Sequence, residues 1–194
     1  MFLHKLAILA CSLGLAACGG SPSEVSESPD HSAAPKTKVA QVHMVEFFDF
    51  GCGHCRTASH TVSNLKKHYG EKLTVEYRNF PLSPRTTRVA EAAECAGKQG
   101  QYKAFHDVYF AGFFGRTSDE DLMSVAQASG VDPKAMMTCV NSGIMKTKIS
   151  EDQKLARQYG VKGTPFFILN QEVAIPGALP EAKFKEILDQ ILSE

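Results

Sequence analysis

Residues 46–60 read EFFDFGCGHCRTASH and place two cysteines, Cys52 and Cys55, three positions apart. The residues just before them, 41–50, are β-branched and aromatic, a composition typical of a buried strand. After Cys55, apolar residues recur at helical spacing as far as Gly70, where a glycine is expected to end a helix. The cysteine pair therefore falls between a strand and a helix. There it could bind a metal, form a structural disulfide or act as a redox centre.

The rest of the chain also alternates strands with helices. Residues 72–80 predict a second strand, and residues 84–159 predict a longer helical tract with Ser-Pro, Ser-x-x-Asp and Asp-Pro start signals. Residues 165–177 predict a hairpin, and residues 180–192 predict a closing amphipathic helix. This order predicts a mixed α/β fold, the context in which a CxxC motif is typical of a thioredoxin-like redox site.

Length and charge restrict the class of protein. A chain of 194 residues with 43% hydrophobic content can bury one sizeable core. Lysine plus arginine and aspartate plus glutamate both number 21, so no net field attracts the chain to nucleic acid. We therefore expect no nucleic-acid partner.

The N-terminal region predicts export. Residues 1–17 have a lysine followed by a short apolar stretch and small residues, as in a signal peptide, and the LAAC segment ending at Cys18 resembles the lipobox of bacterial lipoproteins. An ordinary signal peptide that leaves Cys18 free is the alternative. We expect lipidation of Cys18, a flexible tether over residues 18–38 and a globular domain over residues 39–194. The protein would then be anchored by lipid and face the periplasm, and Gly19 suggests the outer membrane in a Gram-negative cell.

Three segments together resemble the DsbA-like branch of the thioredoxin superfamily: EFFDFGCGHC (46–55), GVKGTPFFILN (160–170) and the segment 80–110. The resemblance covers about residues 40–192. It implies a thioredoxin-like α/β fold with a helical subdomain inserted at about residues 82–146, and it implies no cofactor. One departure is the pair Gly53-His54 between the cysteines, which is found in protein disulfide isomerase, whereas the best-known DsbA members carry Pro-His.

In this fold the two cysteines have different tasks. Cys52 is expected at a helix N-terminus, where free backbone N–H groups and the helix dipole stabilise a thiolate. His54 would add a donor or a positive charge to the same anion. Cys55, one turn into the helix, is expected to be shielded and to act as the resolving thiol.

The resemblance also implies roles for residues outside the motif. Thr164 and Pro165 match the loop whose cis-proline faces the cysteine pair and exposes backbone to a substrate; the alternative is a trans proline at the start of a strand. Glu46 matches a buried acid that could relay protons for Cys55; the alternative is a surface glutamate on an edge strand. We expect Asp49 and Arg56 to support the structure around the site or to lie at its edge, without a direct part in the chemistry.

The remaining cysteines, Cys95 and Cys139, fall in two predicted helices. We expect a structural disulfide between them, the alternative being two buried free thiols. Cys52, Cys55 and a histidine could hold copper or zinc, but Cys95 and Cys139 each stand alone and the histidines show no ligand spacing. We therefore predict no bound metal.

These features predict a monomeric enzyme that exchanges disulfides with reduced or misoxidised exported polypeptides, acting as a dithiol oxidase. A disulfide isomerase or reductase on the same fold is the first alternative, and a copper-binding or other metal-binding module without turnover is the second. A membrane partner, either a quinone-linked oxidase or a transmembrane reductase, would set the direction of electron flow.

Overall fold

The computed structural model describes residues 41–193. The predicted signal peptide, the predicted tether, Cys18 and Gly19 lie outside these residues. The helices and strands are β1 (Val42–Phe48), α1 (Gly53–Tyr69), β2 (Leu73–Asn79), α2 (Pro84–Gly97), α3 (Tyr102–Val108), α4 (Asp119–Ala128), α5 (Pro133–Ser142), α6 (Lys146–Gln158), β3 (Phe166–Leu169), β4 (Val173–Pro176) and α7 (Glu181–Ser193).

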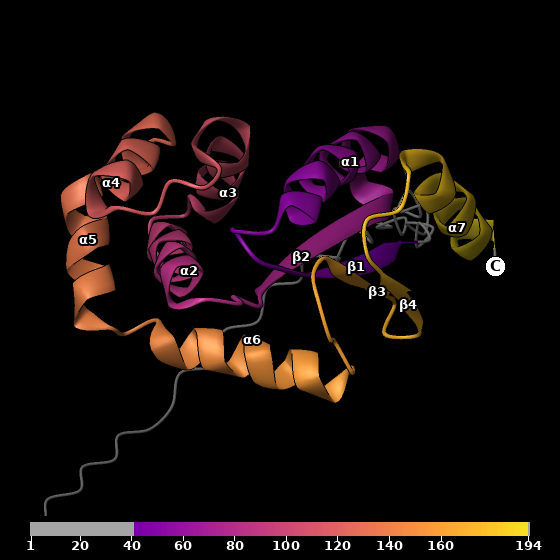
Figure 1. Cartoon of the computed structure of the whole chain (residues 1–194). Helices are drawn as coiled ribbons and strands as arrows, with labels where there is room; N and C mark the ends of the chain where they lie inside the picture. The colour runs from indigo at the N-terminus through magenta and orange to yellow at the C-terminus, as the bar shows by residue number, and fades with distance from the viewer. Residues whose placement is uncertain (1–40, 194) are drawn as a thin grey trace, which may run out of the picture. The chain divides into compact units, whose positions relative to one another are not determined.

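The four strands form one sheet in the order β2-β1-β3-β4 (Figure 1). β1 and β2 are parallel, β3 runs antiparallel to β1, and β4 runs antiparallel to β3. β1 is therefore an inner strand, which explains its nearly continuous run of apolar residues. Glu46 lies at its centre, opposite Tyr77 of β2 on one side and Phe167 of β3 on the other.

Helices cover both faces of the sheet. α1 and α7 pack on one face, where Met44 of β1 and Phe167 of β3 join the apolar side chains of both helices. α6 lies on the other face, where Ala156 packs with Val45 and Phe47 of β1 (Figure 1). β1 is thus buried from above and below, and the side chains that alternate along it point to different helices.

Helices α2 to α5 lie between β2 and α6 in the sequence and share a core that also includes Phe48 and Phe50, next to the CxxC motif. The predicted start signals are confirmed, because Ser83, Ser118 and Asp132 each accept a backbone N–H bond at the first turn of α2, α4 and α5. The sequence did not predict the π-helical turn Tyr109–Phe113 that follows α3. The predicted helical tract is therefore a group of short helices packed against the start of α1.

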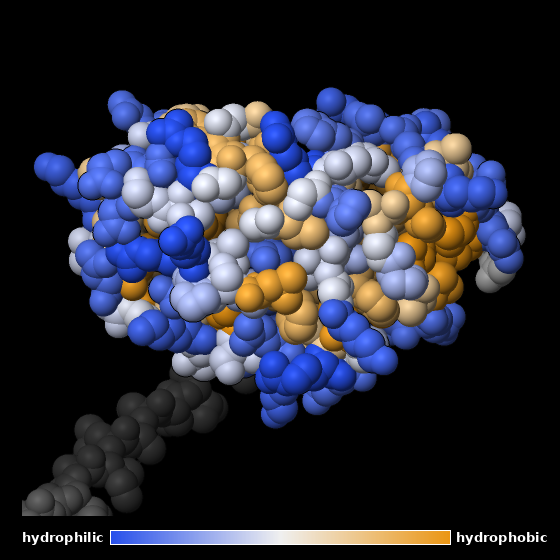
Figure 2. Space-filling view, in the orientation of Figure 1, coloured by the Kyte–Doolittle hydropathy of each residue, from blue (hydrophilic) through white to orange (hydrophobic). Residues whose placement is uncertain are grey.

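The face of the molecule drawn in Figure 2 carries mainly hydrophilic side chains. Figure 2 shows hydrophobic side chains gathered over α7 and the β3–β4 hairpin, where Val173, Ile187 and Ile191 line a pocket of about 380 Å³. Between residues 41 and 193, no helix combines the length and the apolar character that a membrane span requires.

Candidate active site

Cys52 is the N-cap residue of α1. Its sulfur accepts a hydrogen bond from the backbone N–H of Cys55 at 3.4 Å, and its own N–H donates to the carbonyl of Asp49 at 3.0 Å. Cys52 is half-buried, whereas the residues that follow it, Gly53 and His54, are exposed. The positive end of a 17-residue helix dipole therefore points at this sulfur.

A second segment of the chain meets the same sulfur. The thiol of Cys52 donates to the carbonyl oxygen of Thr164 at 3.3 Å, and the peptide bond between Thr164 and Pro165 is cis. The carbonyl of Pro165 accepts the N–H of Gly177 at 2.8 Å, which ties this loop to the end of β4. The resemblance implied that Thr164 and Pro165 would face the cysteine pair, and the contact with Cys52 brings the two segments together.

Cys55 differs from Cys52 in its environment. It is 1% exposed and packs into the core shared with the inserted helices. Burial raises the pKa of the Cys55 thiol, while the backbone of Asp49 and the side chain of Thr164 act in the opposite direction. The two thiols are not bonded to each other, so the structure holds one accessible sulfur and one enclosed sulfur.

Glu46 is a buried carboxyl group in the centre of the sheet. It lies two positions from Met44, which packs with α1, and two positions from Phe48, which packs with Cys55, so its side chain faces the α1 side of the sheet. Glu46 is 1% exposed, and its Oε2 has no hydrogen-bond partner within residues 41–193. Burial raises the pKa of Glu46 to about 8. No hydrogen bond joins it to Cys55 in the described part of the chain.

The two residues between the cysteines are exposed in the first turn of α1. His54 forms no hydrogen bond with the Cys52 sulfur, whose recorded partners in the described chain are Cys55 and Thr164. A Cβ atom added to Gly53 would meet nothing within 4 Å. The backbone therefore requires no glycine at position 53, and the Gly-His pair is open to reacting groups from solvent.

Asp49 and Gly51 shape the turn between β1 and α1, and the sequence did not indicate how. The Asp49 carboxylate, 5% exposed, accepts the N–H of Gly51 at 3.1 Å and the N–H of Leu82 at 3.2 Å. A Cβ atom on Gly51 would lie 2.6 Å from the Cγ2 atom of Thr86 in α2. Gly51 thus allows the inserted helices to approach the motif closely, which only the tertiary structure reveals.

A disulfide bond joins Cys95 of α2 to Cys139 of α5 across 44 positions of sequence. The structure places no third metal-ligating side chain beside Cys52 and Cys55; over residues 41–193 no three His, Cys, Asp or Glu side chains form a metal-binding group.

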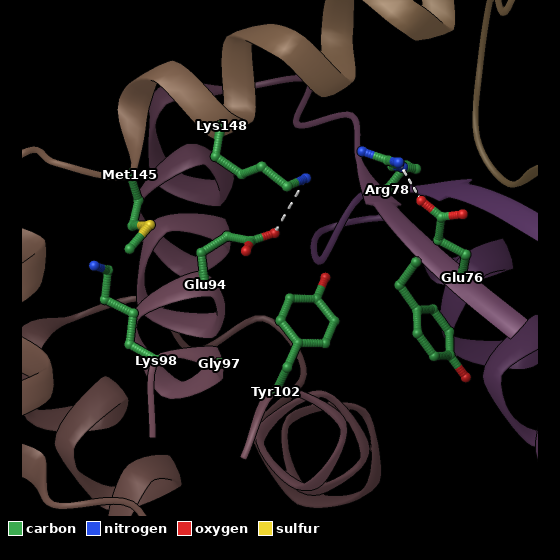
Figure 3. Close-up of a pocket in the computed structure, with 9 residues that line it drawn as sticks. Glu76, Arg78, Glu94, Gly97, Lys98, Tyr102, Met145 and Lys148 are labelled. Carbon is green, nitrogen blue, oxygen red and sulfur yellow. Dashed lines mark ion pairs between the residues drawn. The ribbon is translucent and has the colours of Figure 1, made fainter. Parts of the chain in front are cut away.

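A separate pocket of about 550 Å³ lies between β2, α2, α3 and α6. Figure 3 shows Lys148 facing Glu94 across it, at 3.8 Å, and Arg78 paired with Glu76. Asp152 also pairs with both cations, at 2.6 Å from Lys148 and 2.9 Å from Arg78, and no cysteine lines the pocket. We therefore place the candidate active site at Cys52.

Comparison with known proteins agrees with this geometry. The model of the DSBA-like thioredoxin domain family matches residues 43–189. The chain belongs to this family.

Individual relatives show different degrees of coverage. The chain is 27% identical over 184 residues to the thiol:disulfide interchange protein DsbA of Burkholderia cepacia, with 84% of this chain and 82% of that protein covered. It is 28% identical over 140 residues to the Na(+)/H(+) antiporter NhaA of Herminiimonas arsenicoxydans, with 72% of this chain but only 22% of that protein covered. The chain thus spans about a fifth of the length of the antiporter relatives it matches.

A solved structure supports the fold. The thioredoxin-like oxidoreductase of Silicibacter pomeroyi DSS-3 is 27% identical, covers 80% of this chain and 89% of its own, and superposes with a TM-score of 0.72. The predicted fold class, a thioredoxin-like α/β fold with added helices, is confirmed.

Proposed function

We propose that this chain exchanges disulfides with exported polypeptides through Cys52 and Cys55, and that it acts as a dithiol oxidase. The observation that carries the proposal is the asymmetry of the two sulfurs. Cys52 is accessible at the N-terminus of α1, whereas Cys55 is 1% exposed behind it. An incoming thiolate can therefore reach Cys52 in preference to Cys55.

The reaction starts from the Cys52–Cys55 disulfide. A substrate thiolate attacks the sulfur of Cys52, the bond to Cys55 breaks, and Cys55 leaves as a thiolate that takes up a proton. A second substrate thiolate then attacks the substrate sulfur of the mixed disulfide, and Cys52 leaves as a thiolate. Two electrons pass from the substrate dithiol to the protein, and the substrate gains one disulfide.

Glu46 is proposed to supply and recover the proton of Cys55. Its pKa of about 8 keeps the carboxyl group protonated near neutral pH, and it lies on the α1 side of the sheet. The added charge of the Cys55 thiolate is unfavourable in a buried site, so a nearby proton donor would ease this step.

The direction of electron flow separates the oxidase from its alternatives, an isomerase or a reductase. Family membership and the coverage of a DsbA relative support the oxidase, whereas the Gly53-His54 pair favours the isomerase. A reduction potential of about −120 to −180 mV for the cysteine pair would support an oxidase or isomerase, and one near about −270 mV would support a reductase.

The decisive experiment uses two variants of the cysteine pair. Cys55→Ser should accumulate mixed disulfides with disulfide-bonded substrates, because the Cys52 thiolate can still attack a substrate disulfide but no Cys55 thiolate follows to release the bound substrate. Cys52→Ser should exchange no disulfides. Trapping by Cys52→Ser and normal turnover by Cys55→Ser would contradict these roles.

We also propose the setting in which the domain works. Residues 1–17 would be removed on export, Cys18 would carry the lipid anchor, and residues 18–38 would tether the domain so that it faces the periplasm. The domain would act as a monomer without a cofactor and would exchange electrons with a membrane redox partner.

A further inference from the structure

A pocket lined mainly by polar side chains lies along α1, starting next to Cys52 at Gly53 and ending at Asn64. It has a volume of about 510 Å³. Residues 52, 56, 60 and 64 are spaced four apart and thus share one face of the helix. The pocket is lined by Gly53, Arg56, Thr57, His60, Thr61, Asn64 and Phe114. The nucleophilic sulfur therefore lies at one end of the helix face that forms this pocket.

Arg56 is held in place within the pocket. Its Nε donates to the carbonyl of Phe110 at 3.1 Å, and its guanidinium carbon lies 5.3 Å from the centre of the Phe114 ring. Arg56 forms no ion pair with any acidic side chain of residues 41–193. Its remaining N–H groups are therefore available to a ligand, and the two contacts reduce the entropy lost on binding.

The charge of the pocket favours an anion. No acidic side chain lines it. At the end of the pocket farthest from Cys52, the Glu181 carboxylate accepts a hydrogen bond from Asn64 at 2.9 Å. Lys185 pairs with this carboxylate at 2.8 Å and so offsets its negative charge. At the end near Cys52, Arg56 is the charged lining residue and the threonines add hydroxyl groups.

We propose that this pocket binds an acidic side chain of the substrate polypeptide close to its reacting cysteine. The proposal rests on the disulfide exchange proposed above and names a substrate class for it. Four helical residues rise about 6 Å, which an extended peptide covers in about two residues. The carboxylate that pairs with Arg56 therefore belongs to an aspartate or glutamate two positions from the cysteine.

The test compares two dithiol peptides that differ only in aspartate or asparagine two positions from the reacting cysteine. The oxidised wild-type protein should react about threefold to tenfold faster with the aspartate peptide, as expected for one partly desolvated ion pair. Arg56→Gln should abolish this preference, and Arg56→Glu should transfer it to a lysine peptide.

Arg116→Gln is the matched control. Arg116 also lies over a phenylalanine, with its guanidinium carbon 5.1 Å from the centre of the Phe113 ring, but it is already paired with Asp121 at 2.6 Å. This variant should keep the wild-type preference. Equal rates of the wild type with both peptides, or an undiminished preference in Arg56→Gln, would overturn the proposal. If wild type reacts with neither peptide, the disulfide exchange itself fails instead.

Discussion

The thiol of Cys52 lies 3.3 Å from the carbonyl oxygen of Thr164, a residue 112 positions further along the chain. Only the protonated sulfur can donate this bond, whereas the N–H of Cys55 can serve the sulfur in either state. When Cys52 loses its proton, the Thr164 carbonyl is left with a vacant acceptor. We expect a backbone N–H of the bound substrate to fill it.

Replacement of His54 by alanine should lower the reduction potential of the cysteine pair. His54 is exposed in the first turn of α1, so it can stabilise the thiolate of Cys52 without contributing to the core. A loss of about 1.4 kcal/mol in thiolate stability corresponds to about 30 mV. Equilibration with glutathione measures the potential. His68→Ala, at the far end of the same helix, is the control, and equal potentials in both variants would exclude a role for His54.

Glu46→Gln should remove a pH-dependent loss of stability. The pKa of Glu46 rises from 4.5 to about 8 on folding. The carboxyl group is protonated in both the folded and the unfolded state below about pH 4.5, so its burial has no pH-dependent cost there. Between about pH 4.5 and about pH 8 the free energy of unfolding falls as the pH rises, and above about pH 8 the loss is complete. The variant should match wild type near about pH 4 and exceed it by several kcal/mol near about pH 9, because one pKa unit corresponds to about 1.4 kcal/mol.

Urea unfolding across this pH range measures the effect of Glu46→Gln, with the exposed Glu71→Gln as the control. Parallel curves for wild type and Glu46→Gln would show that the buried carboxyl group does not cause the pH dependence.

The double variant Cys95→Ala/Cys139→Ala should reduce the free energy of unfolding by about 2–4 kcal/mol. The disulfide closes a loop across 44 positions, and its loss restores chain entropy to the unfolded state. The rate of exchange at Cys52 should change little, because this bond joins α2 to α5 rather than the segments at the active site. Denaturant unfolding and a single-turnover assay measure the two quantities. A large loss of rate in a folded variant would contradict this separation.

Cys18→Ser should release the protein from membranes. Acyl chains contribute about 0.8 kcal/mol per buried CH₂, and the substituted residue can carry no thioether-linked lipid. Fractionation after osmotic shock should find the variant in the soluble fraction and wild type with the membranes. Equal membrane retention of the two proteins would rule out Cys18 as the anchor.

Local pattern predicted much of the fold. Composition located β1, helical spacing located α1, and capping residues such as Ser83 and Asp132 marked helices that the structure confirms. These features depend on neighbours in sequence, so they can be read from it. The family resemblance supplied Thr164 and Glu46, which no local pattern would single out.

Other features depend on contacts between distant segments. The close approach of Gly51 to Thr86 and the position of Arg56 over Phe114 each join residues more than thirty positions apart. The exact environment of Glu46, with an unpartnered oxygen, follows from the burial of β1 between β2 and β3. A single sequence carries no local signal for such contacts.

The separation of Cys52 from Thr164 also has a consequence for biogenesis. During synthesis the N-terminal part of the chain leaves the ribosome first, so both motif cysteines are exposed long before the loop with Thr164 has been made. Formation of this contact requires closure of a long loop, an event that comes with a large entropy cost and a high contact order. A translation product that stops within α6 would contain the CxxC helix but lack Thr164, so the full reaction centre arises only when the polypeptide is nearly complete.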